Sequence, residues 1–211
     1  MIVISNTSPL NYLVLIEEIE LLPKLFGQIT IPQAVLHELR RPETPDAVRE
    51  WANVAPSWLQ VRAVSVIDPM INLGTGETEA ISLANELHAD LVLLDDRKAR
   101  NLALARGLSV VGTLNILEAA AVRELADLPS ATIRLLHTNF RAPADLVKTL
   151  IEQDAARRKQ RQTAARKNLS SVVLACPSAF LKPAIRNSQS EIGWRPTAHC
   201  SLSLIVNRIA Q

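Results

Sequence analysis

The sequence is short of cysteine and of long apolar runs. Its 211 residues include two cysteines, Cys176 and Cys200, which lack the Cys-x-x-Cys spacing of zinc knuckles and redox pairs. The longest apolar runs, such as residues 13–16 and 91–94, are far shorter than the roughly 20 residues that cross a bilayer. These absences argue against a disulfide scaffold and against a membrane protein. Because 48% of the residues are nevertheless hydrophobic, we expect a folded, cytoplasmic protein without a signal peptide.

Charge is distributed unevenly along the chain. Residues 1–154 contain 13 Lys and Arg against 20 Asp and Glu, whereas residues 155–211 contain 10 against 1. An acidic body with a basic extension suits a cation-binding domain followed by an arm that binds a polyanion. It equally suits a solvated domain with a poorly structured extension that has no partner. Composition leaves both interpretations open.

Short apolar segments alternate with amphipathic ones in the first three quarters of the chain. Strands are predicted at residues 1–5, 28–31, 58–64, 91–94 and 109–111, and helices from about residue 8 and at 32–40, 46–53, 77–87, 97–106, 114–124 and 143–159. This alternation predicts an α/β fold with a parallel sheet covered by helices on both faces, and ligands at the carboxyl ends of the strands. The periodicity fails after about residue 158. We therefore expect a domain at 1–158 and a basic, Ser- and Pro-containing, irregular tail at 159–211.

Two glutamates lie on the apolar side of predicted helices. Glu77 shares a stripe with the apolar residues three, four and seven positions after it, although a Glu at a helix start also favours the helix dipole. Glu38 follows apolar residues by three and four positions, so it lies on a similar edge. Glu79 falls at the third helical position, where a Glu commonly completes a capping box. We therefore interpret Glu79 as structural and Glu38 and Glu77 as candidate site residues.

Polar residues also follow two of the predicted strands. Asp95 and Asp96 come directly after the apolar strand at 91–94, and a helix start needs only one of them as its cap. Two adjacent carboxylates repel each other unless a cation neutralises them, as in oxygen-ligand sites for Mg²⁺ or Mn²⁺. Asn6 follows the first strand and brings a carbonyl oxygen without charge. It either serves such a site or simply makes a turn at the strand–helix junction.

Other chemistries fit the sequence poorly. The segment Gly74-Thr-Gly76 lacks the Gly-Lys-Ser/Thr of a nucleotide-binding P-loop, and the four histidines show neither triad nor metal spacing. Arg97, Lys98 and Arg100 flank the two aspartates. They are candidates for contacts to phosphate, although a basic helix face is more often merely solvated.

Taken together, these motifs resemble a PIN domain, and specifically the short PIN-related prokaryotic proteins that resemble VapC-type toxins of toxin–antitoxin pairs. The matching stretches lie, in order, at residues 3–10, 31–38, 74–81, 91–100 and 107–113. The resemblance covers about residues 1–155. It implies a three-layer α/β/α sandwich around a central parallel sheet, and an acidic cluster that binds Mg²⁺ or Mn²⁺ and hydrolyses RNA.

The resemblance also assigns roles to individual residues. Glu38, Glu77 and Asp95 match the acidic catalytic and metal-binding positions of the family, with Asp96 as a fourth and Asn6 as a further metal ligand. Beside these positions, we expect RNA contacts from Thr7, Arg97, Lys98 and Arg100. The expected partners are an RNA substrate, a small antitoxin-like protein and a second copy in a homodimer, with no membrane.

Three functions remain open from the sequence. The first is a metal-dependent endoribonuclease that acts as a toxin. The second is a catalytically weak PIN-like module that binds RNA or an antitoxin without cleavage, because Asn6 stands where most PIN nucleases have their first Asp. The third is an α/β domain whose acidic residues are only caps and surface groups, and the apolar-face positions of Glu38 and Glu77 argue against it.

Overall fold

A parallel β-sheet forms the centre of the protein. The computed structural model describes residues 1–174, with side chains described as far as residue 166. Within this part, five strands form one parallel sheet in the order β3-β2-β1-β4-β5. The strands are β1 (Val3–Ser5), β2 (Ile29–Pro32), β3 (Leu59–Arg62), β4 (Leu91–Leu93) and β5 (Val110–Val111). The predicted positions of all five strands are thus confirmed to within a few residues.

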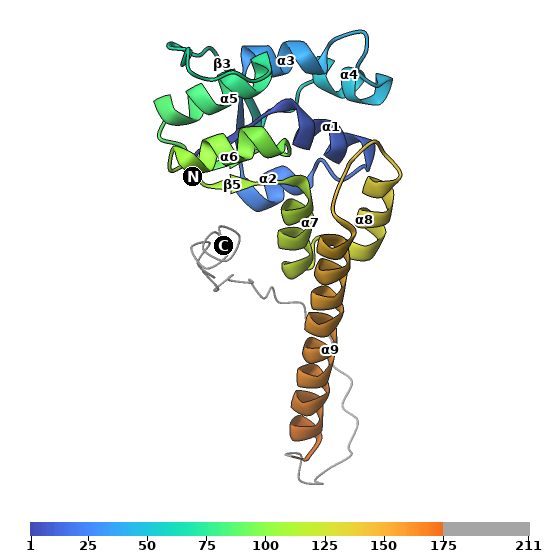
Figure 1. Cartoon of the computed structure of the whole chain (residues 1–211). Coiled ribbons are helices and arrows are strands. Elements are labelled where there is room, and N and C mark those ends of the chain that lie inside the picture. The colour runs from blue at the N-terminus through green and yellow to red at the C-terminus, as the bar shows by residue number, and fades with distance from the viewer. Residues whose placement is uncertain (175–211) are drawn as a thin grey trace, which may run out of the picture.

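Helices cover both faces of this sheet (Figure 1). They are α1 (Thr7–Leu15), α2 (Leu21–Phe26), α3 (Gln33–Leu39), α4 (Asp46–Asn53), α5 (Thr75–Glu86), α6 (Arg97–Ala105), α7 (Thr113–Val122), α8 (Leu128–Leu136) and α9 (Ala144–Leu174). The expected three-layer α/β/α sandwich with a central parallel sheet is confirmed. In the described part of the chain, no helix is both long enough and apolar enough to cross a membrane.

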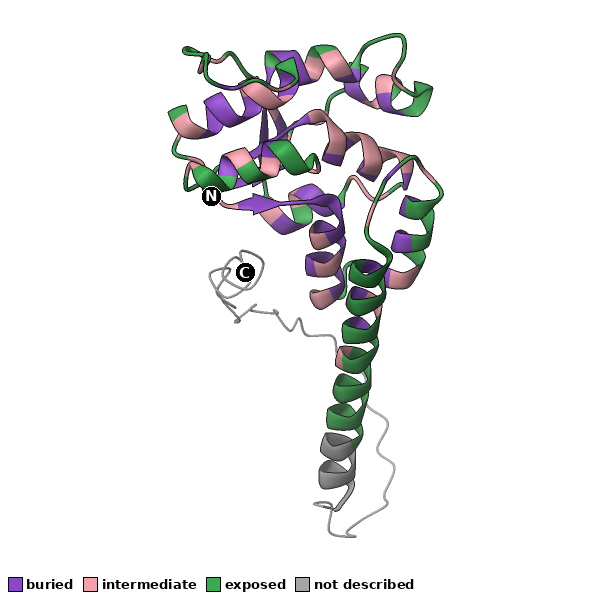
Figure 2. Ribbon diagram, viewed as in Figure 1, coloured by how far each residue is buried: buried purple, intermediate pink, exposed green. Residues whose placement is uncertain are grey.

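Alternating strand residues build two separate cores, one on each face of the sheet. In β4, Leu91 and Leu93 pack into the larger core with α1, α2 and α7, whereas Val92 packs into the smaller core with α5 and α6. This follows from the two-residue period of a strand, which points successive side chains to opposite faces. Because both faces are covered, the strands contain almost no exposed positions (Figure 2). Such a sheet is expected to present polar side chains only at its ends.

Two helices and part of a third differ from the sequence-based prediction. α2 and α8 were not predicted. α9 was expected to end near Lys159 but continues to Leu174, so the prediction of an irregular segment is wrong for residues 159–174. The residues at 160–167 are Gln, Arg, Thr, Ala and Lys, most of which favour helix even without an apolar stripe. The remainder of the predicted tail, residues 175–211, lies outside the described residues.

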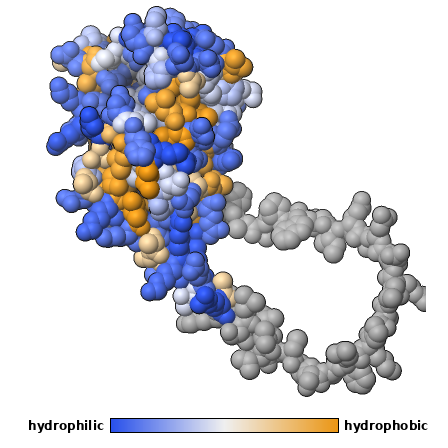
Figure 3. Space-filling view, turned by 90° about the vertical axis from the view of Figure 1, so that its right-hand side faces the viewer, coloured by the Kyte–Doolittle hydropathy of each residue, from blue (hydrophilic) through white to orange (hydrophobic). Residues whose placement is uncertain are grey.

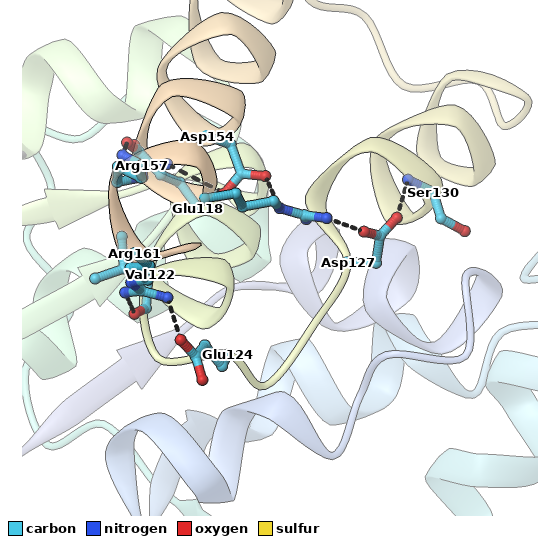
Figure 4. Close-up of polar contacts among 9 residues, drawn as sticks. Glu118, Val122, Glu124, Asp127, Ser130, Asp154, Arg157 and Arg161 are labelled. Atoms are coloured by element: carbon cyan, nitrogen blue, oxygen red, sulfur yellow. Dashed lines mark hydrogen bonds and ion pairs between the residues drawn. The ribbon is translucent and has the colours of Figure 1, made fainter. Parts of the chain in front are cut away.

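Ion pairs fasten α9 to α7 and to the turn before α8 (Figure 4). Asp154 on α9 is 2% exposed, and its Oδ2 lies 2.6 Å from Nε of Arg158. Arg158 also reaches Asp127 at 2.7 Å, and this contact lowers the pKa of the Asp127 carboxyl. Arg157 bridges Asp154 and Glu118, at 3.7 Å and 3.0 Å. These contacts lie one helical turn beyond the apolar anchors of α9, so they extend the docked face.

A third arginine continues this network. Arg161 pairs with Glu124 at 2.6 Å and donates to the carbonyl oxygen of Val122. Three arginines of the basic segment are therefore held against the domain. This arrangement disfavours the interpretation in which the segment is an extension without a partner, and it leaves fewer cations for a polyanion than the sequence alone suggests.

Removing Asp154 should weaken the docking of α9. We expect Asp154→Ala to lower the free energy of unfolding by about 2 kcal/mol, because the change leaves two arginines without a buried counter-charge. Glu152→Ala is the matched control, since Glu152 is exposed and its contact to Lys148 is 4.0 Å long; it should cost at most about 0.5 kcal/mol. Urea unfolding of the three proteins measures both values. Equal stabilities of the two variants would contradict a structural role for the network.

Candidate active site

The carboxyl ends of three neighbouring strands bring polar residues side by side. In the parallel register Ser5 lies opposite Leu93, and Leu93 opposite Val111. The backbone N–H of Asn6 donates to the carbonyl of Leu93 at 3.1 Å. The residues that follow β1, β4 and β5 therefore leave the sheet next to one another, as the strand-end argument predicted.

Thr113 holds the carboxylate of Asp95 in a fixed orientation. The Thr113 backbone N–H donates to Oδ1 at 2.8 Å, and the Thr113 hydroxyl donates to Oδ2 at 2.6 Å. Gly112 lies against the same group, since a Cβ there would come within 3.1 Å of Asp95 Oδ1 and 3.2 Å of Arg100 Nη1. Burial raises the pKa of the Asp95 carboxyl, while the bonds from Thr113 and the charge of Arg100 act in the opposite direction.

Glu38 of α3 is held by groups from α1 and α5. The Thr7 hydroxyl donates to Glu38 Oε2, and the backbone N–H of Gly76 donates to Glu38 Oε1 at 2.9 Å. A Cβ at position 76 would lie 2.5 Å from Glu38 Oε2. A side chain at this position would therefore displace the Glu38 carboxylate from the Gly76 N–H. Glu38 thus lies at the point where α1, α3 and α5 meet.

Glu77 at the start of α5 lies near two other carboxylates. Burial raises its pKa most, and the charges of Asp96 and Glu38 raise it further, while a hydrogen bond from the Gly74 N–H opposes the shift. The Gly74 N–H···Oε2 distance is 3.1 Å and makes Glu77 the capping glutamate of α5. The assignment of this cap to Glu79 is therefore wrong.

Glu79 is nevertheless structural, by a different contact. Its Oε2 accepts a hydrogen bond from the backbone N–H of Ala34 at 3.0 Å. Ala34 lies in the first turn of α3, where backbone N–H groups have no partner within the helix. Glu79 therefore ties the start of α3 to α5 and helps to place Glu38.

Asn6, directly after β1, is almost completely buried. It is 2% exposed, and its Oδ1 has no hydrogen-bond partner among the described residues. A buried acceptor without a partner costs free energy, so such atoms commonly face a water, an ion or a ligand. This oxygen is the feature of the site that most directly suits a cation or a cation-bound water.

The remaining predicted residues lie around these acidic groups. Asp96 is exposed and caps α6 through a 2.9 Å bond from the Ala99 N–H. Arg97 and Lys98 are exposed in the first turn of the same helix. Arg100 lies against Gly112 and Asp95 instead of pointing freely into solvent. The hydroxyl of Thr7, predicted to contact RNA, is occupied by Glu38.

The acidic groups gather at one edge but do not form a metal-ligand shell. Among the described residues, no three His, Cys, Asp or Glu side chains are arranged to hold an ion. That these carboxylates share a metal ion therefore stays a prediction. The donor set nevertheless fits Mg²⁺ or Mn²⁺ chemically, because it consists of carboxylate oxygens and the unpartnered amide oxygen of Asn6. Glu38 and Glu77 would exchange their present hydrogen bonds for such a cation.

Sequence reasoning missed Thr113 and an aromatic residue near the site. Tyr12 of α1 is half-buried, and its ring meets Phe140 edge-on with centroids 5.0 Å apart. Burial raises the pKa of the Tyr12 hydroxyl, the charge of Asp95 raises it further, and that of Arg141 lowers it. Thr113 could have been found from its place directly after a strand, as Asp95 was. Tyr12 carries no such signal, because its spacing matches an ordinary helix face.

The sandwich and its acidic edge together define a PIN-like α/β domain. Residues 2–155 match the family model described as DUF3368, PIN domain, and the chain belongs to this family of PIN domains. The resemblance of the motifs to a PIN domain is thus confirmed. PIN domains are a nuclease-type fold and generally use divalent metal ions.

One similar solved structure is a PilT N-terminus domain protein from the hyperthermophilic archaeon Sulfolobus solfataricus. It is 19% identical, with a TM-score of 0.40, over 68% of this chain and 100% of that one. No curated protein matches the chain significantly.

Proposed function

We propose that this protein is a metal-dependent endoribonuclease and the toxin of a toxin–antitoxin pair. The observation that carries the proposal is the acidic edge, where Glu77 lies near Glu38 and Asp96. At the same edge Asn6, which follows the strand next to that of Asp95, holds a buried oxygen without a partner among the described residues. Membership of a family of generally metal-dependent nucleases supports the same chemistry. The toxin role follows from the resemblance to VapC-type proteins.

In this proposal Mg²⁺ or Mn²⁺ is held by four carboxylates and one neutral ligand. The carboxylates are those of Glu38, Glu77, Asp95 and Asp96, and the neutral ligand is Asn6. When bound, the cation would lower the pKa of a water and neutralise charge on the scissile phosphate. Thr113 fixes the direction of the Asp95 carboxylate, and Gly76 and Thr7 position Glu38.

Cations of α6 contact the RNA in this proposal. Arg97 and Lys98 are exposed and available to backbone phosphates. Arg100 lies close enough to Asp95 for its charge to lower the pKa of that carboxyl. In this proposal Arg100 therefore stabilises the Asp95 carboxylate and does not bind a distant phosphate. Thr7 reaches RNA only if it releases Glu38.

A cleavage assay tests the proposal. We expect the purified protein to cut mixed single-stranded RNA in Mn²⁺ or Mg²⁺ and to lose this activity in EDTA. A preparation of Asp95→Asn made in the same way controls for contaminating nucleases. Cleavage that persists in EDTA, or that is equal in the variant, would overturn the proposal.

Asn6 favours a second function, a PIN-like module that binds RNA or an antitoxin without cutting. Without a carboxylate at this position the site has one less charge for a cation. RNA binding without cleavage in every metal tested would support this second function and contradict the first.

We also propose that the face carrying α8 binds a protein partner. Ile133 and Leu136 of α8 and Leu146 of α9 are exposed, and Figure 3 shows apolar side chains gathered on this face. Exposed apolar patches commonly mark protein–protein interfaces. The proposed partners are a second copy of the chain, detectable by light scattering of the isolated protein, and a small antitoxin-like protein.

A further inference from the structure

A hollow lies next to Glu38, on the side of the α3–α4 loop. It has a volume of about 620 Å³ and is lined by Glu38, Arg41, Pro42, Glu43 and Thr44. The hollow is wide open to solvent, so it suits one unit of a longer ligand that runs along the surface. Glu38 is also a candidate metal ligand, so the hollow shares one residue with the proposed active site.

The loop that forms this hollow is fixed by hydrogen bonds from within the protein. The Thr44 hydroxyl donates to the carbonyl of Glu38 at 2.8 Å. Arg49 donates to the carbonyls of Pro42 and Thr44 at 3.2 and 3.3 Å, and pairs with Asp46 at 2.6 Å. The shape of the hollow is therefore largely set before any ligand binds, which reduces the entropy lost on binding.

Arg41 belongs to this fixed loop, and its side chain is available to bind a ligand. Its backbone N–H donates to the carbonyl of Glu38 at 3.2 Å, which places the residue one turn from the site. Arg41 is exposed, and its guanidinium makes no hydrogen bond or ion pair with the described residues. A guanidinium offers paired donors that match the oxygens of a phosphate. The nearby Arg49, by contrast, already has three acceptors.

We propose that this hollow binds a nucleotide adjacent to the scissile phosphate, with Arg41 contacting the phosphate of that nucleotide. The proposal rests on the proposed nuclease function and names its substrate as single-stranded RNA. Single-stranded RNA can turn one nucleotide out into a hollow at little cost, whereas a base-paired nucleotide must first unpair and unstack. Pro42 supplies an apolar wall for the sugar or base. The phosphate must lie on the Arg41 side, because the Glu43 carboxylate would repel it.

Binding of a fluorescent single-stranded RNA, measured by anisotropy in EDTA over a series of salt concentrations, tests the proposal without requiring cleavage. Arg41→Gln should weaken binding about tenfold, as expected for loss of one charge-assisted contact. It should also make the slope of log K against log salt shallower by about 0.7, the value for one phosphate of a single strand. Arg41→Lys should keep the slope and lose only part of the affinity.

Lys24→Gln is the matched control. Lys24 is exposed on α2, before β2 and therefore toward the amino end of the sheet. The Lys24→Gln change removes the same charge and should leave both affinity and slope near those of the wild type. Thermal unfolding verifies that each variant is folded.

Three results would overturn the proposal. They are wild-type affinity and slope for Arg41→Gln, an equal loss for Lys24→Gln, and no RNA binding by the wild type. A basic peptide is the alternative ligand of the hollow. It is indicated if Arg41→Gln keeps its RNA affinity and if a Lys-rich peptide binds the wild type but does not bind Glu43→Gln. An effect of Arg41→Gln on binding with no cleavage by the wild type would contradict the proposed nuclease function alone.

Discussion

Replacing Asp95 with Asn should remove most of the metal-linked stability and reduce metal-dependent RNA cleavage by about 100-fold or more. A cation at about 100 times its dissociation constant stabilises the folded state by about 2.7 kcal/mol. For a chain of this size that corresponds to a rise in Tm of roughly 5–10 °C. If the variant binds the cation about 100-fold more weakly, the same metal concentration stabilises its folded state by only about 0.4 kcal/mol. This corresponds to a rise in Tm of roughly 1 °C.

The same substitution should change how stability depends on pH when no metal is present. Burial raises the pKa of the Asp95 carboxyl, so between its ordinary and its raised pKa the folded state keeps a proton that the unfolded state has lost. Because the unfolded state then binds fewer protons, the stability of the wild type falls as pH rises through this window. The amide that replaces the carboxyl in the variant does not ionise. Asp95→Asn should therefore be the more stable protein above the window, and the gap should close in acid.

Differential scanning calorimetry with Mn²⁺ and with EDTA, at several pH values, measures both effects. Asparagine has the shape of aspartate and still accepts the Thr113 N–H, so the variant should fold. Asp145→Asn is a matched control, because Asp145 is exposed at the start of α9. A metal-induced rise in Tm that is equal in all three proteins would show that Asp95 is not a ligand.

The fold followed from the sequence because its strands are apolar, short and separated by helices. Leu91 to Leu94 is a continuous apolar run, which is typical of a strand buried on both faces. The same logic located Asn6 and Asp95, since residues that follow neighbouring parallel strands must lie together. Most of the other helices were recognised by their alternation with strands, and α8 was missed because no strand lies next to it in the sequence. The length of α9 was missed because its polar, helix-forming residues leave no apolar stripe.

The site was predicted less completely, for a physical reason. Periodicity states which face a side chain occupies, but not which hydrogen bonds it makes there. Glu38 was therefore placed on an inner edge without its partners Thr7 and Gly76, and the cap was given to Glu79 instead of Glu77. The partners come from elements 31 to 38 residues away in sequence. Such contacts depend on tertiary packing, which local spacing does not encode.

The second large effect is expected from adding the carboxylate that Asn6 lacks. Asn6→Asp should tighten Mn²⁺ or Mg²⁺ binding by about tenfold or more, because another anionic oxygen would face the cation. Without metal the same change should lower the free energy of unfolding, since a new carboxylate would be buried at a position that is 2% exposed. The variant should thus gain more stability from metal than the wild type does.

Titration calorimetry with Mn²⁺ gives the affinities, and thermal unfolding with and without metal gives the two stabilities. Asn101→Asp, at an exposed position on α6, adds the same charge away from the buried oxygen and should change metal affinity little. If cleavage rises with affinity in Asn6→Asp, the wild type is a nuclease limited by the charge at this position. Unchanged affinity in Asn6→Asp, or a gain matched by Asn101→Asp, would show that the unpartnered oxygen of Asn6 does not face the cation.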